Sequence, residues 1–115
     1  MTDYNHVVLC GRITREVTVR YTPRGTSIAR IRLSVTRRFT PRGETKYKVE
    51  QGFFTVEFWG RSGETAFQFL NVGNTIIVDG HLKQEVWRNK EGETNHRTYV
   101  VGHTWQQIDR CLKGQ

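Results

Sequence analysis

Polar and apolar residues alternate along most of this chain, which is the pattern of β-strands whose two faces meet different surroundings. The alternating runs are residues 7–13, 17–21, 28–39, 47–59, 75–87 and 94–101, with a short edge segment expected at 104–108. Residues 62–73 break the rhythm: Ala66, Phe67 and Leu70 fit one helical face, Ser62 or a neighbour is suited to cap it, and Gly73 to end it. The pattern therefore predicts a β-protein with one short helix.

Five main strands with a helix between the third and the fourth are the pattern of the OB-fold, a small Greek-key barrel. The chain has 115 residues, and no linker, repeat or low-complexity tract divides it. We therefore expect one all-β domain over residues 1–115, with the barrel at about 5–108. An OB-fold can bind oligonucleotides, sugars or proteins, so the function has to come from particular residues.

The most informative run is residues 53–59, because it carries aromatic rings on both faces of one strand. The apolar face, predicted to be core, consists of Phe54, Val56 and Phe58. The other face carries Phe53, Thr55, Glu57 and Trp59, and its polar members predict contact with water. Two large rings on a wet face indicate a surface on which flat ligands stack.

Two further rings extend this reasoning to neighbouring strands. Trp87 ends the mostly polar face of residues 79–87 and precedes the basic turn that contains Arg88 and Lys90. Phe39 has the parity of Ile31 and other apolar residues of its strand. It is therefore either a core residue at the end of the barrel or a ring turned outward by a twist or bulge.

Charge narrows the class of ligand. The formal net charge is +7 and the sequence pI is about 9.9. Residues 1–48 hold eleven basic and three acidic side chains, a balance of +8, whereas residues 49–115 hold seven and eight, a balance of −1. Concentrated positive charge suits a polyanion, because neutralising phosphates releases counterions.

Rings and cations together match single-stranded nucleic acid, which exposes base faces and carries one phosphate per nucleotide. Each base stacked on a ring contributes about 1–3 kcal/mol, almost regardless of its identity. The basic residues expected to track the backbone are Arg37, Arg38, Arg42, Lys46, Lys48, Lys83, Arg88 and Lys90. No amide or carboxylate stands out for reading base edges, so tight binding without sequence preference is predicted.

Other classes of function find little support. The four histidines, His6, His81, His96 and His103, match no metal-ligand spacing and have no carboxylate pair beside them, so neither catalysis, a metal nor a cofactor is expected. Cys10 lies in an apolar run and is expected to be buried, and with Cys111 it defines no disulfide framework. There is no signal pattern and no apolar run of about 20 residues, so no membrane partner is expected. A reducing cytoplasmic compartment is the default, with association with the nucleoid expected and an organelle not excluded.

Several motifs, in order and spacing, resemble the bacterial single-stranded DNA-binding (SSB) proteins. The resemblance covers residues 5–101. Residues 5–14 (NHVVLCGRIT) resemble the first strand of that family, and residues 19–26 (VRYTPRGT) match its arginine-tyrosine-x-proline-x-glycine turn. Residues 58–60 (FWG) take the place of its aromatic-glycine step, and residues 67–73 with 78–82 (VDGHL) follow its helix and its valine-x-glycine-x-leucine strand.

This resemblance implies stacking roles for Phe39, Phe53, Trp59 and Trp87, and so favours the outward orientation of Phe39. Phenylalanine stands at positions 39 and 53 where the family commonly has tryptophan, and Trp59 stands where phenylalanine is common. The resemblance also implies a homotetramer, with a dimer as the alternative for a divergent member. Subunits would pair edge to edge through Asn5, His6, Val7, Val8, Leu9 and Cys10.

The resemblance implies protection of single-stranded DNA in replication, recombination and repair. The family usually continues into a flexible linker and an acidic tip that recruits other proteins, but this chain stops at Gln115 without such a tip. A tailless or truncated relative, with doubtful recruitment through the tip, is therefore the expectation. Two alternatives to DNA binding stay open: an SSB-like module specialised for protein interaction in a primosome-type assembly, and binding of single-stranded RNA.

Overall fold

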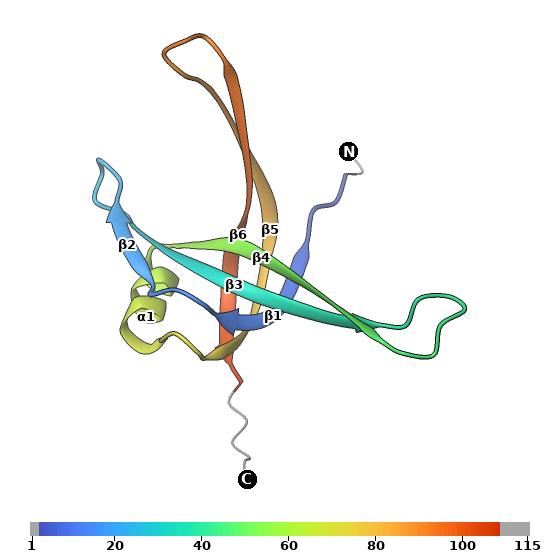
Figure 1. The fold of residues 1–115 in the computed structure, drawn as a ribbon. Helices are drawn as coiled ribbons and strands as arrows, with labels where there is room; N and C mark the ends of the chain where they lie inside the picture. The colour runs from blue at the N-terminus through green and yellow to red at the C-terminus, as the bar shows by residue number, and fades with distance from the viewer. Residues whose placement is uncertain (1–2, 109–115) are drawn as a thin grey trace.

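A computed structural model describes residues 3–108 and shows a closed β-barrel with one helix (Figure 1). The elements follow one another as β1 (Val7–Ile13), β2 (Thr18–Tyr21), β3 (Ser27–Phe39), β4 (Lys48–Trp59), α1 (Arg61–Phe69), β5 (Thr75–Arg88) and β6 (Thr94–Gln107). The helix lies between β4 and β5, which are the third and fourth of the five main strands β1, β3, β4, β5 and β6. The sequence-based expectation of an OB-fold is confirmed.

The barrel closes through β1, which pairs antiparallel with β5 on one side and, at its end, with β3 on the other. The order around the sheet is β1-β5-β6-β4-β3-β2, and β4 and β6 are parallel over three residue pairs. The short strand β2 adds to the free part of β3. The expected edge segment at 104–108 is instead the last part of β6, which pairs with β5 across a bulge at Asp79/Gly80.

The core fills this barrel with apolar side chains from five strands and the helix. Its buried members are Ile13, Val17, Ala29, Ile31, Leu33, Val56, Phe58, Ala66, Leu70, Ile76, Val78 and Val100. Phe58 is fully buried, and a Cβ on Gly102 would lie 2.3 Å from its ring. A side chain at position 102 would therefore collide with the centre of the core.

The helix covers one end of the barrel and is shorter than the sequence predicted. It begins after Gly60, whose φ of 70° suits glycine, and no side chain forms a capping hydrogen bond there, so the expected cap by Ser62 or a neighbour is wrong. Ala66 and Leu70 are buried, as expected. Phe67, predicted on the same face, is 56% exposed. It does not lie under the barrel but lines a surface hollow together with Val72 and four other residues.

Two long hairpins project from the barrel in different directions (Figure 1). One joins β3 to β4 and the other joins β5 to β6, and each extends past the point where a third strand pairs with it. β4 pairs with β6 only from Val56 to Phe58, so its residues 48–55 belong to the first hairpin alone. Likewise β1 pairs with β5 no further than Gly80.

The hairpins explain a wrong prediction about the core. Phe54 has core parity and pairs with the buried Leu33, yet it is 41% exposed. It lies beyond the last β4–β6 pair, where no strand covers it, and its ring leans along the strand to within 3.0 Å of a Cβ built on Gly52. Leu82, which shares the parity of Ile76 and Val78, is exposed for the same reason.

The expectation of a buried cysteine is also wrong. Cys10 is exposed and forms no disulfide with any residue in 3–108, while Cys111 lies outside the described residues. Val8 and Cys10 point to the outer face of β1, whereas Val7 and Leu9 pack against the core. The apolar run 7–10 thus divides between two faces. No helix in the described part of the chain is long and apolar enough to cross a bilayer.

Candidate nucleic-acid interface

Three of the four predicted stacking rings are exposed on the outer side of the sheet. Phe53, Trp59 and Trp87 are 49%, 42% and 47% exposed. In β4, Phe53 and Trp59 lie on the face opposite to Val56 and Phe58, as alternation predicts. Trp87 lies on β5 with Lys83 and Glu85, near the tip of the β5–β6 hairpin.

Contacts between side chains show that β4 and β5 contribute to one outer surface. The Lys83 ammonium lies 6.0 Å from the centre of the Trp59 ring, within the range of a cation–π contact. The Arg32 guanidinium lies 5.4 Å from the centre of the Phe53 ring. Trp59 and Phe53 therefore each have a cation beside them, which is the combination that a stacked base and its phosphate require.

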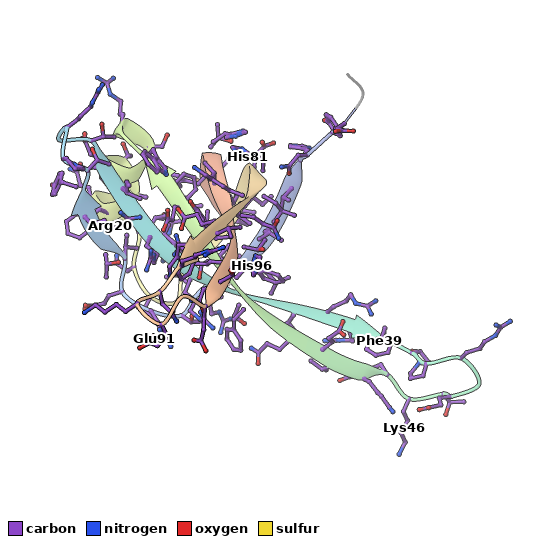
Figure 2. All side chains as sticks on the ribbon, turned by 90° about the horizontal axis from the view of Figure 1, so that it is seen from above. Arg20, Phe39, Lys46, His81, Glu91 and His96 are labelled. Carbon is purple, nitrogen blue, oxygen red and sulfur yellow. The ribbon has the colours of Figure 1, made fainter. Side chains whose placement is uncertain are left out.

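Phe39 occupies a different position. It lies at the end of β3, pairs with Lys48, and shares the parity of Leu33 rather than that of Phe53's partner Ser34. It is half-buried, with the Arg37 guanidinium 4.6 Å from its ring centre. Figure 2 shows Phe39 far out on the β3–β4 hairpin, away from the barrel. The structure thus does not bring Phe39 to the other three rings, and its role in stacking stays a prediction.

The predicted basic residues divide between the two hairpins. Arg37, Arg38, Arg42, Lys46 and Lys48 lie on the β3–β4 hairpin, whereas Lys83, Arg88 and Lys90 lie on the β5–β6 hairpin. All eight are exposed. Arg37 also pairs with Glu50, at 3.1 Å, and Arg38 stacks on the ring of Tyr47, a 56% exposed residue that the sequence reasoning missed.

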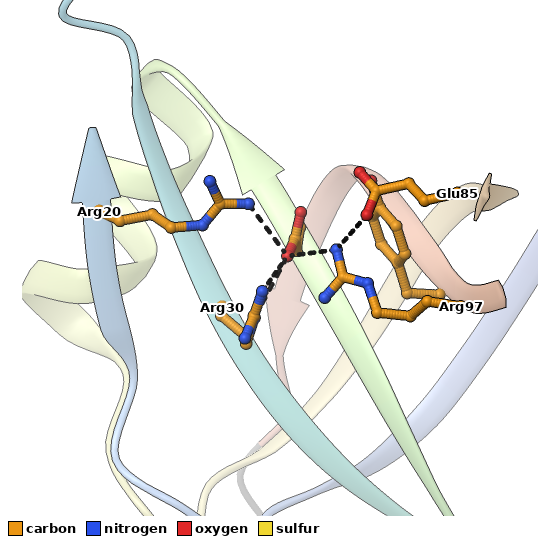
Figure 3. Close-up of polar contacts among 6 residues, drawn as sticks. Arg20, Arg30, Glu85 and Arg97 are labelled. Atoms are coloured by element: carbon orange, nitrogen blue, oxygen red, sulfur yellow. Dashed lines mark hydrogen bonds and ion pairs between the residues drawn. The ribbon is translucent and has the colours of Figure 1, made fainter. Parts of the chain in front are cut away.

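The central part of the outer face holds an ion cluster that the sequence reasoning also missed. Glu57 was expected to face water, but it is completely buried. Its Oε2 lies 2.8 Å from Arg30 Nη2, and 3.6 Å from both Arg20 Nη2 and Arg97 Nη2 (Figure 3). The three arginines come from β3, β2 and β6, so side chains that are far apart in sequence cover this carboxylate.

A second carboxylate extends the cluster along the β5–β6 hairpin. Glu85 accepts hydrogen bonds from Arg97 at 2.9 Å and from the Tyr99 hydroxyl at 3.1 Å. Although burial acts to raise it, these two hydrogen bonds hold the pKa of Glu85 below its usual value. Burial, the charge of Glu57 and the hydrogen bond to Glu85 raise the pKa of Tyr99.

The signal for this cluster was present in the alternation. Arg30 shares its polar face with Arg32, and Glu57 shares its own with Phe53 and Trp59. Register, which sequence did not provide, pairs Arg30 directly with Glu57. Arg97 reaches Glu57 from β6, which runs parallel beside β4.

Three of the four histidines form a separate group around Asp79 in the first half of β5, whereas His96 lies on the β5–β6 hairpin opposite Val86. His6 Nε2 lies 3.1 Å from Asp79 Oδ2, His103 Nδ1 lies 3.8 Å from Asp79 Oδ1, and His81 Nδ1 lies 2.7 Å from His103 Nε2. Within residues 3–108, no three His, Cys, Asp or Glu side chains are arranged to hold a metal ion.

The predicted edge for subunit pairing is the free side of β1. Asn5 continues the strand direction by exchanging hydrogen bonds with the backbone of Leu82, at 2.8 and 2.9 Å. His6 to Cys10 follow, and among residues 3–108 the side of β1 away from β5 pairs with β3 only at Arg12 and Ile13. Its backbone at residues 7–10 is therefore available on that side, although pairing with a second subunit stays a prediction.

Comparisons with known proteins identify the family and the fold. The model of the single-strand binding protein family matches residues 4–108. A single-stranded DNA-binding protein of Treponema pallidum is 33% identical over 114 residues, covering 99% of this chain and 63% of the relative. One from Helicobacter hepaticus is 35% identical over 118 residues, covering 96% and 65%. The chain thus spans somewhat under two thirds of the length of these relatives.

Solved structures give the same fold. The single-stranded DNA-binding protein of Thermus aquaticus, in a deletion variant, superposes with a TM-score of 0.82 and 27% identity, over 92% of this chain and 51% of that one. A Plasmodium falciparum SSB in complex with single-stranded DNA superposes with a TM-score of 0.84 over 95% and 98% of the two chains. Because its identity is only 16%, this second likeness shows the fold alone.

Proposed function

The chain belongs to the single-strand binding protein family, and from this premise we propose that it binds single-stranded DNA without sequence preference. In this proposal bases stack on Phe53, Trp59 and Trp87, and arginine and lysine side chains bind the phosphates. Binding would protect the single strand during replication, recombination and repair, without catalysis and in the cytoplasm at the nucleoid. The relatives named above are single-stranded DNA-binding proteins, which supports the choice of ligand.

One observation carries this proposal: exposed rings and cations meet on the outer face of the barrel. Trp59 and Phe53 are each about half exposed, and each has a cation within 6.0 Å of its ring centre. Neither ring belongs to the buried core, and both offer flat apolar surface to a base. The cations attract phosphates, so the surface favours a phosphate-bearing ligand over a neutral apolar one.

We also propose that the protein acts as a homotetramer, with a dimer as the smaller alternative. The free side of β1 at residues 7–10 supports this, since a second β1 could pair there and cover Val8 and Cys10. Light scattering measures the mass directly. A strict monomer at working concentration would contradict this part of the proposal.

The proposed function is tested by titrating poly-dT into the protein and following tryptophan fluorescence at two salt concentrations. Stacking should quench the fluorescence, and phosphate contacts should make the affinity fall with salt. Trp59→Ala and Trp87→Ala should each weaken binding by about 1–3 kcal/mol while leaving the unfolding transition unchanged.

Trp105 offers the matched control. It is a half-buried tryptophan that is not among the proposed stacking rings, and its indole donates a hydrogen bond to the Ser62 carbonyl at 3.2 Å. Trp105→Phe should remove the fluorescence contributed by Trp105 without weakening the binding of poly-dT. Unchanged affinity in both Trp59→Ala and Trp87→Ala would contradict stacking, and equal or tighter binding of oligo-U would favour RNA as the ligand.

A further inference from the structure

The ion cluster around Glu57 contains a buried negative charge within a surface that carries mainly positive side chains. The Glu57 carboxylate is completely buried within the proposed DNA track, by which we mean the outer surface that carries Phe53, Trp59 and Trp87. One of its oxygens, Oε1, has no hydrogen-bond partner among the described residues. Burying a charge is costly unless it is paired. Here all the pairing falls on Oε2, which three guanidiniums approach within 3.6 Å.

The three arginines contact Glu57 but use few of their hydrogen-bond donors within the described residues. Side chains of Arg20, Arg30 and Arg97 remain 54%, 44% and 30% exposed. Each guanidinium has five N–H donors. Within residues 3–108, the hydrogen bonds that these groups make are two from Arg30 to Glu57 and one from Arg97 to Glu85. Most of the donors therefore remain free for an anion from solvent.

We propose that Glu57 is a positioning residue that holds Arg20, Arg30 and Arg97 together as one phosphate-binding subsite. The inference rests on the proposed function, because the ligand is a phosphodiester of a bound single strand. Three guanidiniums this close repel one another unless a negative charge lies among them. Glu57 supplies that charge from beneath, so the arginines stay converged and a phosphate meets them without reorganising the site.

The surroundings of the cluster place this phosphate between the rings. A groove of about 290 Å³ runs beside Arg30 and is lined by Arg15, Glu16, Thr18, Arg30, Arg32 and Thr55. Arg32 also lies over the Phe53 ring, so the groove connects the cluster with that ring. On the other side, Glu57 is two residues from Trp59 on the same face of β4. A strand whose bases stack on Phe53 and Trp59 would carry its backbone past this cluster.

Net charge and positioning predict opposite signs for one substitution. Glu57→Gln keeps the size of the side chain but removes a negative charge from the DNA track. If only net charge mattered, the variant would bind DNA more tightly. If Glu57 positions the arginines, the variant should bind oligo-dT more weakly, on the order of tenfold at low salt, since about one charge-assisted hydrogen bond is lost. Glu57→Asp, which keeps the charge, should recover part of this loss.

A probe without bases separates the subsite from the stacking rings. An abasic deoxyribose-phosphate oligomer offers phosphates but nothing to stack. Glu57→Gln should weaken its binding as it weakens that of oligo-dT, whereas Trp59→Ala should change it little. If Glu57→Gln binds either oligomer as tightly as the unaltered protein, or more tightly, positioning by Glu57 is wrong.

Arginine variants keep the test decisive even if Glu57→Gln fails to fold. Arg20→Gln and Arg97→Gln leave Glu57 paired with Arg30, and each should reduce the slope of log affinity against log salt by about 0.7, the value of one phosphate contact on a single strand. Arg24→Gln removes the same charge from the exposed β2–β3 turn and should leave the slope nearly unchanged. Slopes for Arg20→Gln and Arg97→Gln equal to that of Arg24→Gln would overturn the subsite.

The two levels of proposal fail differently. If the unaltered protein does not bind oligo-dT, or if Trp59→Ala and Trp87→Ala both bind it normally, single-stranded DNA binding by stacking is wrong. If the unaltered protein binds oligo-dT and the two tryptophan variants bind it more weakly, while the Glu57 and arginine variants behave like their controls, only the phosphate subsite is wrong.

Discussion

The two halves of β4 differ in how well alternation predicts which side chains are buried, although they belong to one continuous strand. In its second half, Val56 and Phe58 are completely buried and Trp59 is exposed, as alternation predicts, and Glu57 departs from it because three arginines cover it. In its first half, residues 48–54 are exposed or half-exposed on both faces. The difference is that β6 pairs with β4 only from Val56 to Phe58, where the barrel closes. Alternation therefore predicts which face is inner only where another layer covers it.

The comparison predicts its largest effect in the core. Phe58→Ala should destabilise the protein by about 3–5 kcal/mol, because a fully buried ring leaves a cavity behind. Phe54→Ala, four residues away on the same face, should cost no more than about 1 kcal/mol, since its ring is already 41% exposed. Urea unfolding of both variants measures the difference. Equal losses would show that the hairpin half is packed against something in solution, such as a second subunit.

A pair of glycines gives the next largest effect. A Cβ on Gly80 would lie 2.1 Å from the Val101 carbonyl oxygen, where two backbones meet at the bulge, so Gly80→Ala should cost about 1–3 kcal/mol or more. A Cβ on Gly52 would meet only the Phe54 ring, at 3.0 Å, and that exposed ring is able to swing away. Gly52→Ala should therefore change the midpoint of thermal unfolding much less. A larger loss for Gly52→Ala would contradict this account of the hairpin.

The smallest effect is expected from an ion pair beyond the barrel. The pKa of Glu85 is held below its usual value, so the ionised form stabilises the folded state. That contribution is present above the unfolded value of about 4.5 and is lost as the pH falls through the lower folded pKa. Glu85→Gln should lower the urea midpoint slightly at neutral pH, and the gap should close at acidic pH. A gap that stays constant with pH would exclude the charge as its cause.

How far sequence leads can be judged from particular residues. Alternation and turn residues predict the order of the strands along the chain, the place of the helix and the exposure of Phe53, Trp59 and Trp87. The structure confirms these predictions. Phe54 and Cys10 were misjudged because local pattern does not reveal where a barrel ends or which side of a strand is covered. The Glu57 cluster needed the register of β3, β4 and β6, which only the folded chain provides.

The two hairpins also differ in what anchors them to the barrel. The Glu85–Arg97 pair joins the β5–β6 hairpin to the buried Glu57, whereas the β3–β4 hairpin has the exposed Arg37–Glu50 pair. The arms carry Trp87 and Phe39 respectively. We expect the ring on the anchored arm to occupy a more fixed position than the ring on the other.

The parallel pairing of β4 with β6 has a mechanical consequence. Only three residue pairs, from Val56–Val100 to Phe58–Gly102, join these strands, and Glu57 lies in the middle of that seam. This contact and the β1–β3 contact, which has two residue pairs at Arg12 and Ile13, are the shortest in the barrel, so the barrel would open first at one of them under load. A strand of DNA held by Arg30 on β3 and Arg97 on β6 would cross the seam from outside and act as a clasp over it. Pulling the DNA taut would then press on the joint that keeps the barrel closed.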